Sequence, residues 1–183
     1  MVIADKLYTI DEFEAYAATQ SEKLLELIDG RIVEKVISEE HGKIAIWLGY
    51  LIITYLQEHP EIKGHWSSEA SYTPTGDDKN ERRPDVSFRL TDKAVSRATR
   101  FEGMPDFVAE VKSKTNSYDE LREKAKFYLE QGSRLVWLIY PEPQFVEVYF
   151  EDGTSAAFKE GQTLSGENVL PNFEVPVSKL FNF

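Results

Sequence analysis

Two long stretches of the chain carry apolar residues at helical spacing. The clearer one extends from Ile44 to Leu56, where apolar side chains three and four positions apart fall on one helix face. Ser38 can cap this helix at its start, and Pro60 stops it. The other stretch extends from Ser117 to Gln131. Helices are therefore predicted over residues 9–19 (with Thr9 and Glu12 as a capping box), 38–59, 117–131 and 177–181.

Shorter apolar runs bounded by turn residues predict the strands. Asp29-Gly30 lies between two such runs and is typical of a tight β-hairpin. The runs 135–140 and 145–150 form a second pair, joined by a turn at residues 141–143. Because strands and helices are mixed around one sheet, the predicted class is α/β (α+β), in a single domain over residues 1–183. Strands are predicted at 24–37 (the hairpin), 64–72, 84–90, 106–113, 135–140, 145–150 and after Gly153.

The composition limits the chemistry and the location of the chain. There is no cysteine, which excludes disulfides, thiolate zinc sites and cysteine nucleophiles. Residues 1–11 lack the basic region and apolar stretch of a secretory signal. No apolar run approaches the roughly eighteen residues needed to span a bilayer. We therefore expect a cytoplasmic protein.

The charge of the chain is negative overall but uneven. A net charge of -11 disfavours nonspecific nucleic-acid binding, which normally relies on lysine and arginine neutralising phosphates. Residues 79–100, however, hold seven basic side chains against three acidic ones, and Asp85 lies among them. Arg82, Arg83 and Arg89 are therefore candidate contacts to nucleic acid, with a solvated loop as the commoner alternative.

Charged residues interrupt two strands that are otherwise apolar enough to be central. In the run 106–113, Glu110 and Lys112 project to the same side, since alternate strand residues share a face. Burying them is costly unless they are paired or hold a metal ion. Asp85, at the start of the run 84–90, offers a second carboxylate. The plain alternatives are a solvated edge-strand pair and an aspartate that merely starts a strand.

Two carboxylates and a lysine suit the hydrolysis of phosphodiesters. Hard divalent ions such as Mg²⁺, for which Mn²⁺ would substitute, take oxygen ligands and usually keep several waters. A metal ion held by Asp85 and Glu110 would lower the pKa of a bound water and stabilise charge growing on a phosphoryl group. Lys112 would orient the attacking water or stabilise the transition state. The main-chain carbonyl of Val111 could complete the inner shell of the metal.

Pro84-Asp85 followed by Glu110-Val111-Lys112 resembles the signature of the PD-(D/E)XK nuclease superfamily. The wider chain, from Leu24 to Tyr149, resembles the Uma branch, a family of restriction-endonuclease-like proteins abundant in cyanobacteria. The superfamily signature is short, whereas the ordered set of matching segments is far more specific. The matching segments are 26–30 with Glu34, His41, 83–85, 105–113, Asp119, Lys124, Tyr128, Gly132 and 136–140.

The resemblance implies a restriction-endonuclease-like core, in which helices flank a mixed four-stranded sheet and Asp85 and Glu110 bind Mg²⁺. Many Uma-type sequences carry an apolar residue at the position of Lys112 and rely on a lysine of the following helix. In this chain that helix lysine is Lys124. Both lysines are thus candidates for the catalytic cation, and strand geometry favours Lys112. An intrahelical ion pair is the plain alternative for Lys124.

Two further residues are candidates for accessory roles. His41 could contact phosphate or assist proton transfer, or it could simply lie in the first turn of its helix. Glu34 shares a strand face with Ile32 and Val36. It could supply a third carboxylate to the metal site or cap a neighbouring group.

These observations predict a Mg²⁺-dependent endodeoxyribonuclease that acts on DNA. The alternative from another class is a catalytically silent nucleic-acid- or protein-binding module on the same fold, which the acidity of the chain favours. A hydrolase of smaller phosphoesters is a third hypothesis. A homodimer is expected because two active sites can cut two strands. The aromatic residues that could form its interface, or could equally belong to the core, are Trp137, Tyr140, Phe145 and Tyr149.

Overall fold

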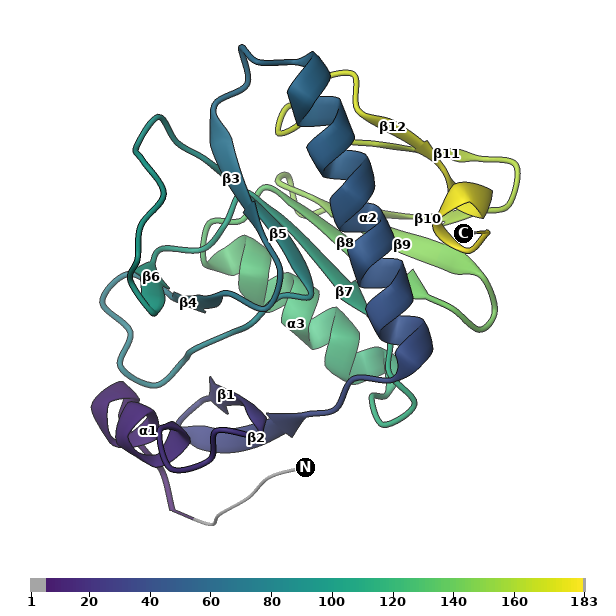
Figure 1. The fold of residues 1–183 in the computed structure, drawn as a ribbon. Coiled ribbons are helices and arrows are strands. Elements are labelled where there is room, and N and C mark those ends of the chain that lie inside the picture. The colour runs from purple at the N-terminus through teal and green to yellow at the C-terminus, as the bar shows by residue number, and fades with distance from the viewer. Residues whose placement is uncertain (1–5, 183) are drawn as a thin grey trace.

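The centre of the molecule is a six-stranded mixed sheet (Figure 1), in a computed structural model that describes residues 6–182. Its strands are β3 (Gly64–Ser67), β5 (Val86–Leu90), β7 (Phe107–Val111), β8 (Leu135–Tyr140), β9 (Phe145–Phe150) and β10 (Ser155–Lys159). They lie in the order β10-β9-β8-β7-β5-β3. β7 and β8 are parallel, and the other neighbours are antiparallel. The predicted mixed α+β class is confirmed, with two more strands than the four that the resemblance implies.

Helices cover both faces of this sheet, and strand alternation decides which side chains meet each helix. The helices are α1 (Ile10–Ala17), α2 (Glu39–Glu58), α3 (Tyr118–Glu130) and the 3₁₀ helix η1 (Val177–Leu180). α2 shares an apolar cluster with Ala109 and Trp137, whereas α3 shares another with Val108 and Val136. Because neighbouring strand residues point to opposite faces, the two helices lie on opposite sides of the sheet. This double cover explains why β7 and β8 are buried along their whole length.

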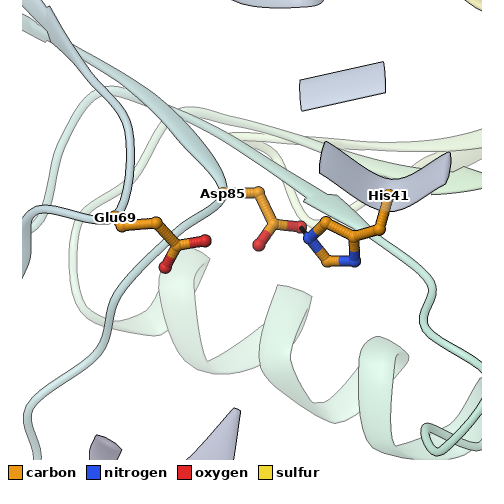
Figure 2. Close-up of side chains that lie close together, drawn as sticks. All are labelled: His41, Glu69 and Asp85. Atoms are coloured by element: carbon orange, nitrogen blue, oxygen red, sulfur yellow. Dashed lines mark ion pairs between the residues drawn. The ribbon is translucent and has the colours of Figure 1, made fainter. Parts of the chain in front are cut away.

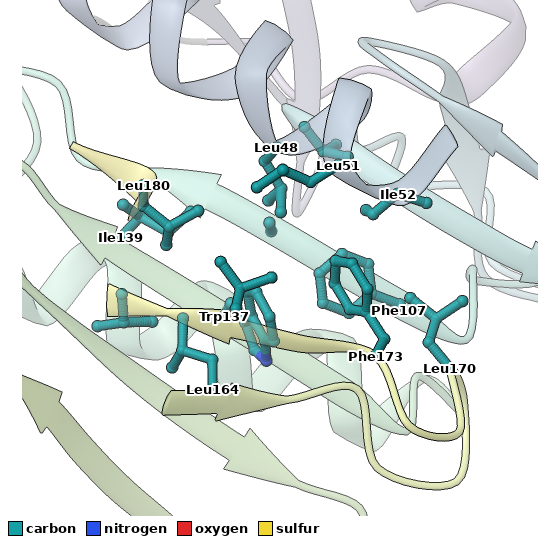
Figure 3. Packing of buried hydrophobic residues seen from close by; sticks show 14 of the residues in the cluster. Leu48, Leu51, Ile52, Phe107, Trp137, Ile139, Leu164, Leu170, Phe173 and Leu180 are labelled. Carbon is teal, nitrogen blue, oxygen red and sulfur yellow. The ribbon is translucent and has the colours of Figure 1, made fainter. Parts of the chain in front are cut away.

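The C-terminal segment completes the core on the α2 side. β11 (Thr163–Ser165) and β12 (Glu174–Pro176) pair with each other and lie beside this face of the sheet (Figure 3). Leu164 and Phe173 from this segment join the α2 cluster. Phe173 stacks on Trp137, with 6.2 Å between the ring centroids. The core on this sheet face therefore combines helix α2, the sheet and the C-terminal segment.

The N-terminal helix and hairpin form a small unit with an apolar cluster of its own. β1 (Leu24–Ile28) and β2 (Arg31–Lys35) form the predicted hairpin, and Asp29 and Gly30 in its turn both have positive φ, as a tight primed turn requires. α1 begins with the predicted capping box of Thr9 and Glu12. The buried members of the cluster are Ile10, Phe13, Leu25, Leu27 and Ile32. A backbone bridge from Leu27 to Glu81 ties the hairpin to the segment that precedes β5.

The stretch 64–72, predicted as one strand, contains two. β3 belongs to the main sheet, whereas β4 (Ser71–Thr73) pairs in parallel with β6 (Arg100–Glu102). The chain breaks at Glu69, whose φ of 55° lies outside the extended region. β6, β11 and β12 are absent from the sequence prediction because strands of three residues are too short to show alternation.

The aromatic residues considered for an interface are partly in the core. Trp137 and Tyr140 are fully buried. Phe145 and Tyr149 are half-buried and pack against the α3-side cluster. The homodimer therefore stays a prediction, and of these four residues only Phe145 and Tyr149 are exposed enough to contribute to its interface.

Across residues 6–182, no helix is both long and apolar enough to cross a membrane. The expectation that residues 1–11 form no secretory signal depends partly on residues 1–5, which lie outside the described residues.

Candidate active site

The two predicted carboxylates face each other across neighbouring strands. β5 and β7 run antiparallel, with Val86 paired to Ala109. One residue beyond that pair, the same register sets Asp85 opposite Glu110. Both side chains are buried, Asp85 with 0% and Glu110 with 3% of its surface exposed. The backbone N–H of Val111 donates to Oδ2 of Asp85 at 2.6 Å, so the end of β7 also positions the aspartate.

Helix α3 supplies two side chains to Glu110. Nζ of Lys124 lies 3.5 Å from Oε2 of Glu110, and the hydroxyl of Tyr128 donates to Oε1 at 2.8 Å. Lys124 and Tyr128 are four residues apart, so they project from the same helix face. The helix lysine that the resemblance singles out therefore belongs to the buried carboxylate cluster.

Lys112 lies elsewhere. Its Nζ donates to the carbonyl oxygen of Ser113 at 3.2 Å and sits 5.3 Å from the centroid of the Tyr118 ring. Among the ion pairs of residues 6–182, none joins Lys112 to Asp85 or Glu110. β7 ends at Val111, so the strand alternation that favoured Lys112 does not extend to it.

A lysine that the sequence did not single out occupies the middle of the site. Nζ of Lys35, at the end of β2, lies 2.5 Å from Oδ1 of Asp85 and 2.7 Å from Oε2 of Glu69. It also donates to the carbonyl oxygen of Arg83 at 2.6 Å. Only 8% of the Lys35 side chain is exposed. This ammonium is therefore enclosed by three oxygen atoms from two segments of the chain, the β3–β4 loop and the residues before β5.

Glu26 of β1 is a further carboxylate of the cluster. Its Oε2 lies 3.1 Å from Nζ of Lys124, and its Oε1 accepts a hydrogen bond from the backbone N–H of Arg83 at 2.9 Å. A sequence signal for it existed, because Glu26 is the single charge in the apolar run 24–28, just as Glu110 is in β7. Lys35 and Glu69 had no such signal, since they lie at a strand end and in a loop.

His41 approaches Asp85 from the first turn of α2. Its Nε2 lies 2.9 Å from Oδ2 of Asp85, and the histidine is buried. Figure 2 shows Asp85 between His41 and Glu69, with the ion pair to His41 marked. One potential ligand atom from each of these three side chains lies within 4.8 Å of the others. This group shares Asp85 with the predicted metal pair but not Glu110.

Two of the four carboxyl groups are held ionised. Burial raises the pKa of Asp85, but the charges of Lys35 and His41 outweigh burial and hold it well below its usual range. Burial also opposes ionisation of Glu26, yet Lys124, Lys35 and Arg82 lower its pKa to about 2. These two carboxylates keep their negative charge at neutral pH.

For the other two carboxyl groups, Glu110 and Glu69, nearby positive charges offset only part of the effect of burial on the pKa. Burial raises the pKa of Glu110, with Asp85 adding to the effect against the opposing charge of Lys124. Burial raises the pKa of Glu69 to about 7, despite the nearby charge of Lys35. Glu110 faces the ionised Asp85, and a cation bound between two such buried carboxyl groups would stabilise the charged form of both.

The remaining predicted residues lie around the site rather than in it. Glu34 lies 3.0 Å from Nζ of Lys23, with 30% of its side chain exposed. Arg82 is buried, with its guanidinium 4.2 Å from the centroid of the Phe127 ring. Two predicted nucleic-acid contacts also have partners within the protein: Arg83 with Glu81 at 3.4 Å, and Arg89 with the carbonyl oxygen of Glu102 at 3.0 Å.

The carboxylate cluster opens into a cavity of about 800 Å³ between the hairpin, the start of α2 and α3. Glu26, Lys35, His41, Glu110 and Lys124 all line it. Eight carboxyl side chains and five lysine or arginine side chains line this cavity, so its lining, called here the acidic mouth, is more acidic than basic. A substrate that carries many negative charges would meet repulsion there, whereas divalent cations would be attracted.

Comparisons with known proteins give a family and a fold. Residues 10–178 match the family model Uma2, described as "Putative restriction endonuclease". No curated protein matches the chain. The chain is similar to the crystal structure of "a putative nuclease belonging to DUF820" from Anabaena variabilis, with 22% identity and a TM-score of 0.80 over 94% of this chain and 97% of the other. At that identity the likeness shows the fold alone.

Proposed function

This chain belongs to the Uma2 family, and from that membership we propose that it is a metal-dependent endonuclease that hydrolyses phosphodiester bonds in DNA. The observation that carries the proposal is the buried pair Asp85 and Glu110, set opposite each other by the register of β5 and β7. The residues fit a hard divalent cation such as Mg²⁺, because the donors are carboxylate oxygens and the pKa of Glu110 is raised by burial and by Asp85.

Each side chain of the site has a separate role in the proposed hydrolysis. Asp85 and Glu110 would hold the Mg²⁺, which when bound lowers the pKa of a coordinated water and stabilises charge on the phosphoryl group. His41 and the N–H of Val111 orient Asp85 by contacts of 2.9 and 2.6 Å. Lys124 keeps its proton, since the charges of Glu110 and Glu26 outweigh burial and raise its pKa. It would act as a fixed cation beside the reacting phosphate.

The geometry favours Lys124 over Lys112 as the catalytic lysine. Lys124 contacts Glu110 and Glu26, whereas Lys112 contacts Ser113 and the Tyr118 ring. Replacement of Lys124 by methionine should lower the rate of DNA cleavage by about 10²–10⁴-fold. Replacement of Lys112 by methionine should leave the rate within a few-fold of wild type. If Lys112→Met lowered the cleavage rate far more than Lys124→Met, Lys112 would be the catalytic lysine instead.

The carboxylates are tested by supercoiled-plasmid cleavage with Mg²⁺ or Mn²⁺, together with calorimetric titration of the metal. Asp85→Asn and Glu110→Gln should each abolish both cleavage and metal binding. Glu151→Gln, at an exposed carboxylate that pairs with Arg134 and does not line the cavity, is the matched control and should retain both. Cleavage that survives either carboxylate change would disprove this mechanism. An absence of metal binding in the wild type would favour a catalytically silent binding module.

The acidic mouth favours a second candidate, a hydrolase of smaller phosphoesters. Such substrates carry one or two negative charges and would meet less repulsion from the surrounding carboxylates. The rates of hydrolysis of plasmid DNA and of bis(p-nitrophenyl) phosphate, compared under the same metal concentration, decide between them. Turnover of the small diester alone would support this second function.

A further inference from the structure

We infer that the Lys35 ammonium takes the place of a second metal ion in this site, so that the protein binds one divalent cation rather than two. The inference rests on the proposed function, because it concerns the number of metal ions in the same site. It begins from the surroundings of Nζ. Three oxygen atoms, from Asp85, Glu69 and the main chain at Arg83, lie within 2.5–2.7 Å of it.

These oxygen atoms form the kind of shell that a hard cation takes. Two are carboxylate oxygens and one is a main-chain carbonyl, which are all ligands that Mg²⁺ or Mn²⁺ accepts. They come from the β3–β4 loop and the segment that leads into β5, while Lys35 comes from β2. Two metal ions in one nuclease site lie about 3.5–4 Å apart, which is close enough for them to share a carboxylate ligand. Here the shared carboxylate would be Asp85, with Lys35 on one side of it.

The charges of the cluster leave one cation position, not two. Four carboxyl groups meet two buried lysines, and each lysine has a separate location. Lys35 lies between Asp85 and Glu69, whereas Lys124 lies between Glu110 and Glu26 at the longer distances of 3.5 and 3.1 Å. The tightly enclosed position is therefore filled by the protein itself. The looser side, at Glu110, is where a metal ion would enter.

Removal of the Lys35 ammonium should convert its position into a metal site. His41, Glu69 and Asp85 would then present ligand atoms within 4.8 Å of one another with no lysine charge among them (Figure 2). Carboxylate oxygens suit Mn²⁺, and a neutral imidazole is the commonest metal ligand in proteins. The rival interpretation is that Lys35 only fastens the hairpin to the core through buried ion pairs. That role predicts a loss of stability but no change in the number of metal ions.

The test is the stoichiometry of Mn²⁺ bound to the full chain, measured by calorimetry and by electron paramagnetic resonance. The wild type should bind one Mn²⁺ with an uncoupled spectrum. Lys35→Met should bind two, with a spectrum of two coupled ions. The double variant Lys35→Met with Glu69→Gln should return to one. Lys23→Met is the matched control, because Lys23 pairs with Glu34 on the exposed side of the same hairpin.

Each result either supports or overturns the inference. One Mn²⁺ in Lys35→Met, folded as judged by circular dichroism, would overturn it while leaving the proposed function intact. Two coupled ions in the wild type would overturn it even if Lys35→Met failed to fold. If neither protein bound Mn²⁺, the result would contradict the proposed metal-dependent function, and the inference that rests on it would be overturned as well. Two ions in Lys35→Met and one in the double variant are the expected outcome.

Discussion

Asp85 is fully buried and accepts from three groups of the protein: the Lys35 ammonium, the His41 imidazole and the Val111 N–H. Replacement by alanine would leave Lys35 and His41 buried without this partner. We expect Asp85→Ala to lower the free energy of unfolding by about 3–5 kcal/mol, the usual cost of breaking a buried ion pair. Urea denaturation without metal measures it. Glu34→Ala, which removes the partly exposed pair with Lys23, should cost about 1 kcal/mol or less. Equal losses would contradict the burial argument.

Glu69 makes the stability of the metal-free protein depend on pH. Its pKa is raised from an ordinary value of 4.5 to about 7, mainly by burial. Between these two values the folded protein holds a proton that the unfolded chain has released. The contribution of Glu69 is therefore unfavourable above its folded pKa, and the penalty disappears as pH falls toward its unfolded pKa.

Glu69→Gln, which resembles the protonated form, should therefore gain stability relative to wild type at about pH 8 and lose that advantage near pH 5. Urea midpoints of both proteins across this range provide the measurement. A stability difference between the two proteins that stays constant with pH would show that Glu69 does not titrate in this way.

Both carboxylates of the pair could be predicted from single residues, whereas of the two lysines of the site only Lys124 was a candidate, through the family resemblance. Glu110 was visible because a charge in an apolar strand demands a partner, and Asp85 followed from the neighbouring strand. Lys35 and Glu69 were not visible, since their meeting depends on how the hairpin and a loop dock onto the sheet. Strand alternation also favoured Lys112, and only the end of β7 at Val111 shows why Lys124 is nearer.

Among the elements, α3 matters most to the site because it carries both Lys124 and Tyr128. Its start is fixed by a capping box in which Ser117 accepts from the backbone N–H of Glu120 at 3.1 Å. Ser117→Ala should lower the free energy of unfolding by about 1 kcal/mol, because a helix N–H loses its acceptor. Thermal or urea unfolding measures this loss. Ser117→Asp, which can still cap, should retain most of the stability, and an equal loss in both would contradict the capping argument.

Local signals also explain which elements were predictable. The helices were visible through caps and apolar faces that lie within a few residues of one another, and the hairpin through Asp29-Gly30. The order of the strands was not visible, because β3 pairs with β5 and β5 with β7 across long connections. The parallel pair of β4 and β6 likewise depends on contacts far apart in the chain. Such pairings are decided by packing rather than by local sequence.

At the scale of the whole molecule, the acidic mouth should determine how the rate of DNA cleavage depends on salt concentration. The affinity of ordinary DNA-binding proteins for DNA falls as the salt concentration rises, because counterions compete for the phosphates. Here the carboxylates around the cavity would repel DNA, and salt would screen that repulsion over roughly 10 Å at 0.1 M. The rate of DNA cleavage at subsaturating DNA and fixed Mg²⁺ should therefore rise as KCl is raised from about 20 to about 100 mM.

A small diester provides the control for this salt effect, because it carries little charge and its hydrolysis should change far less over the same range. A cleavage rate that falls steadily from the lowest salt would instead indicate a basic DNA surface. In that case Arg83 and Arg89, each replaced by glutamine, would be the first residues to examine.

The separate apolar cluster of α1 and the hairpin has a thermodynamic consequence. This unit delivers Glu26 and Lys35 to the site, yet its buried side chains belong to neither sheet-face cluster. Partial unfolding could therefore detach it while the six-stranded sheet persists. On heating, activity should be lost several degrees before the main loss of ellipticity, and amides of β1 should exchange faster than those of β8. Loss of activity and global unfolding would then be two events, so the lifetime of the proposed active site would depend on the stability of α1 and the hairpin.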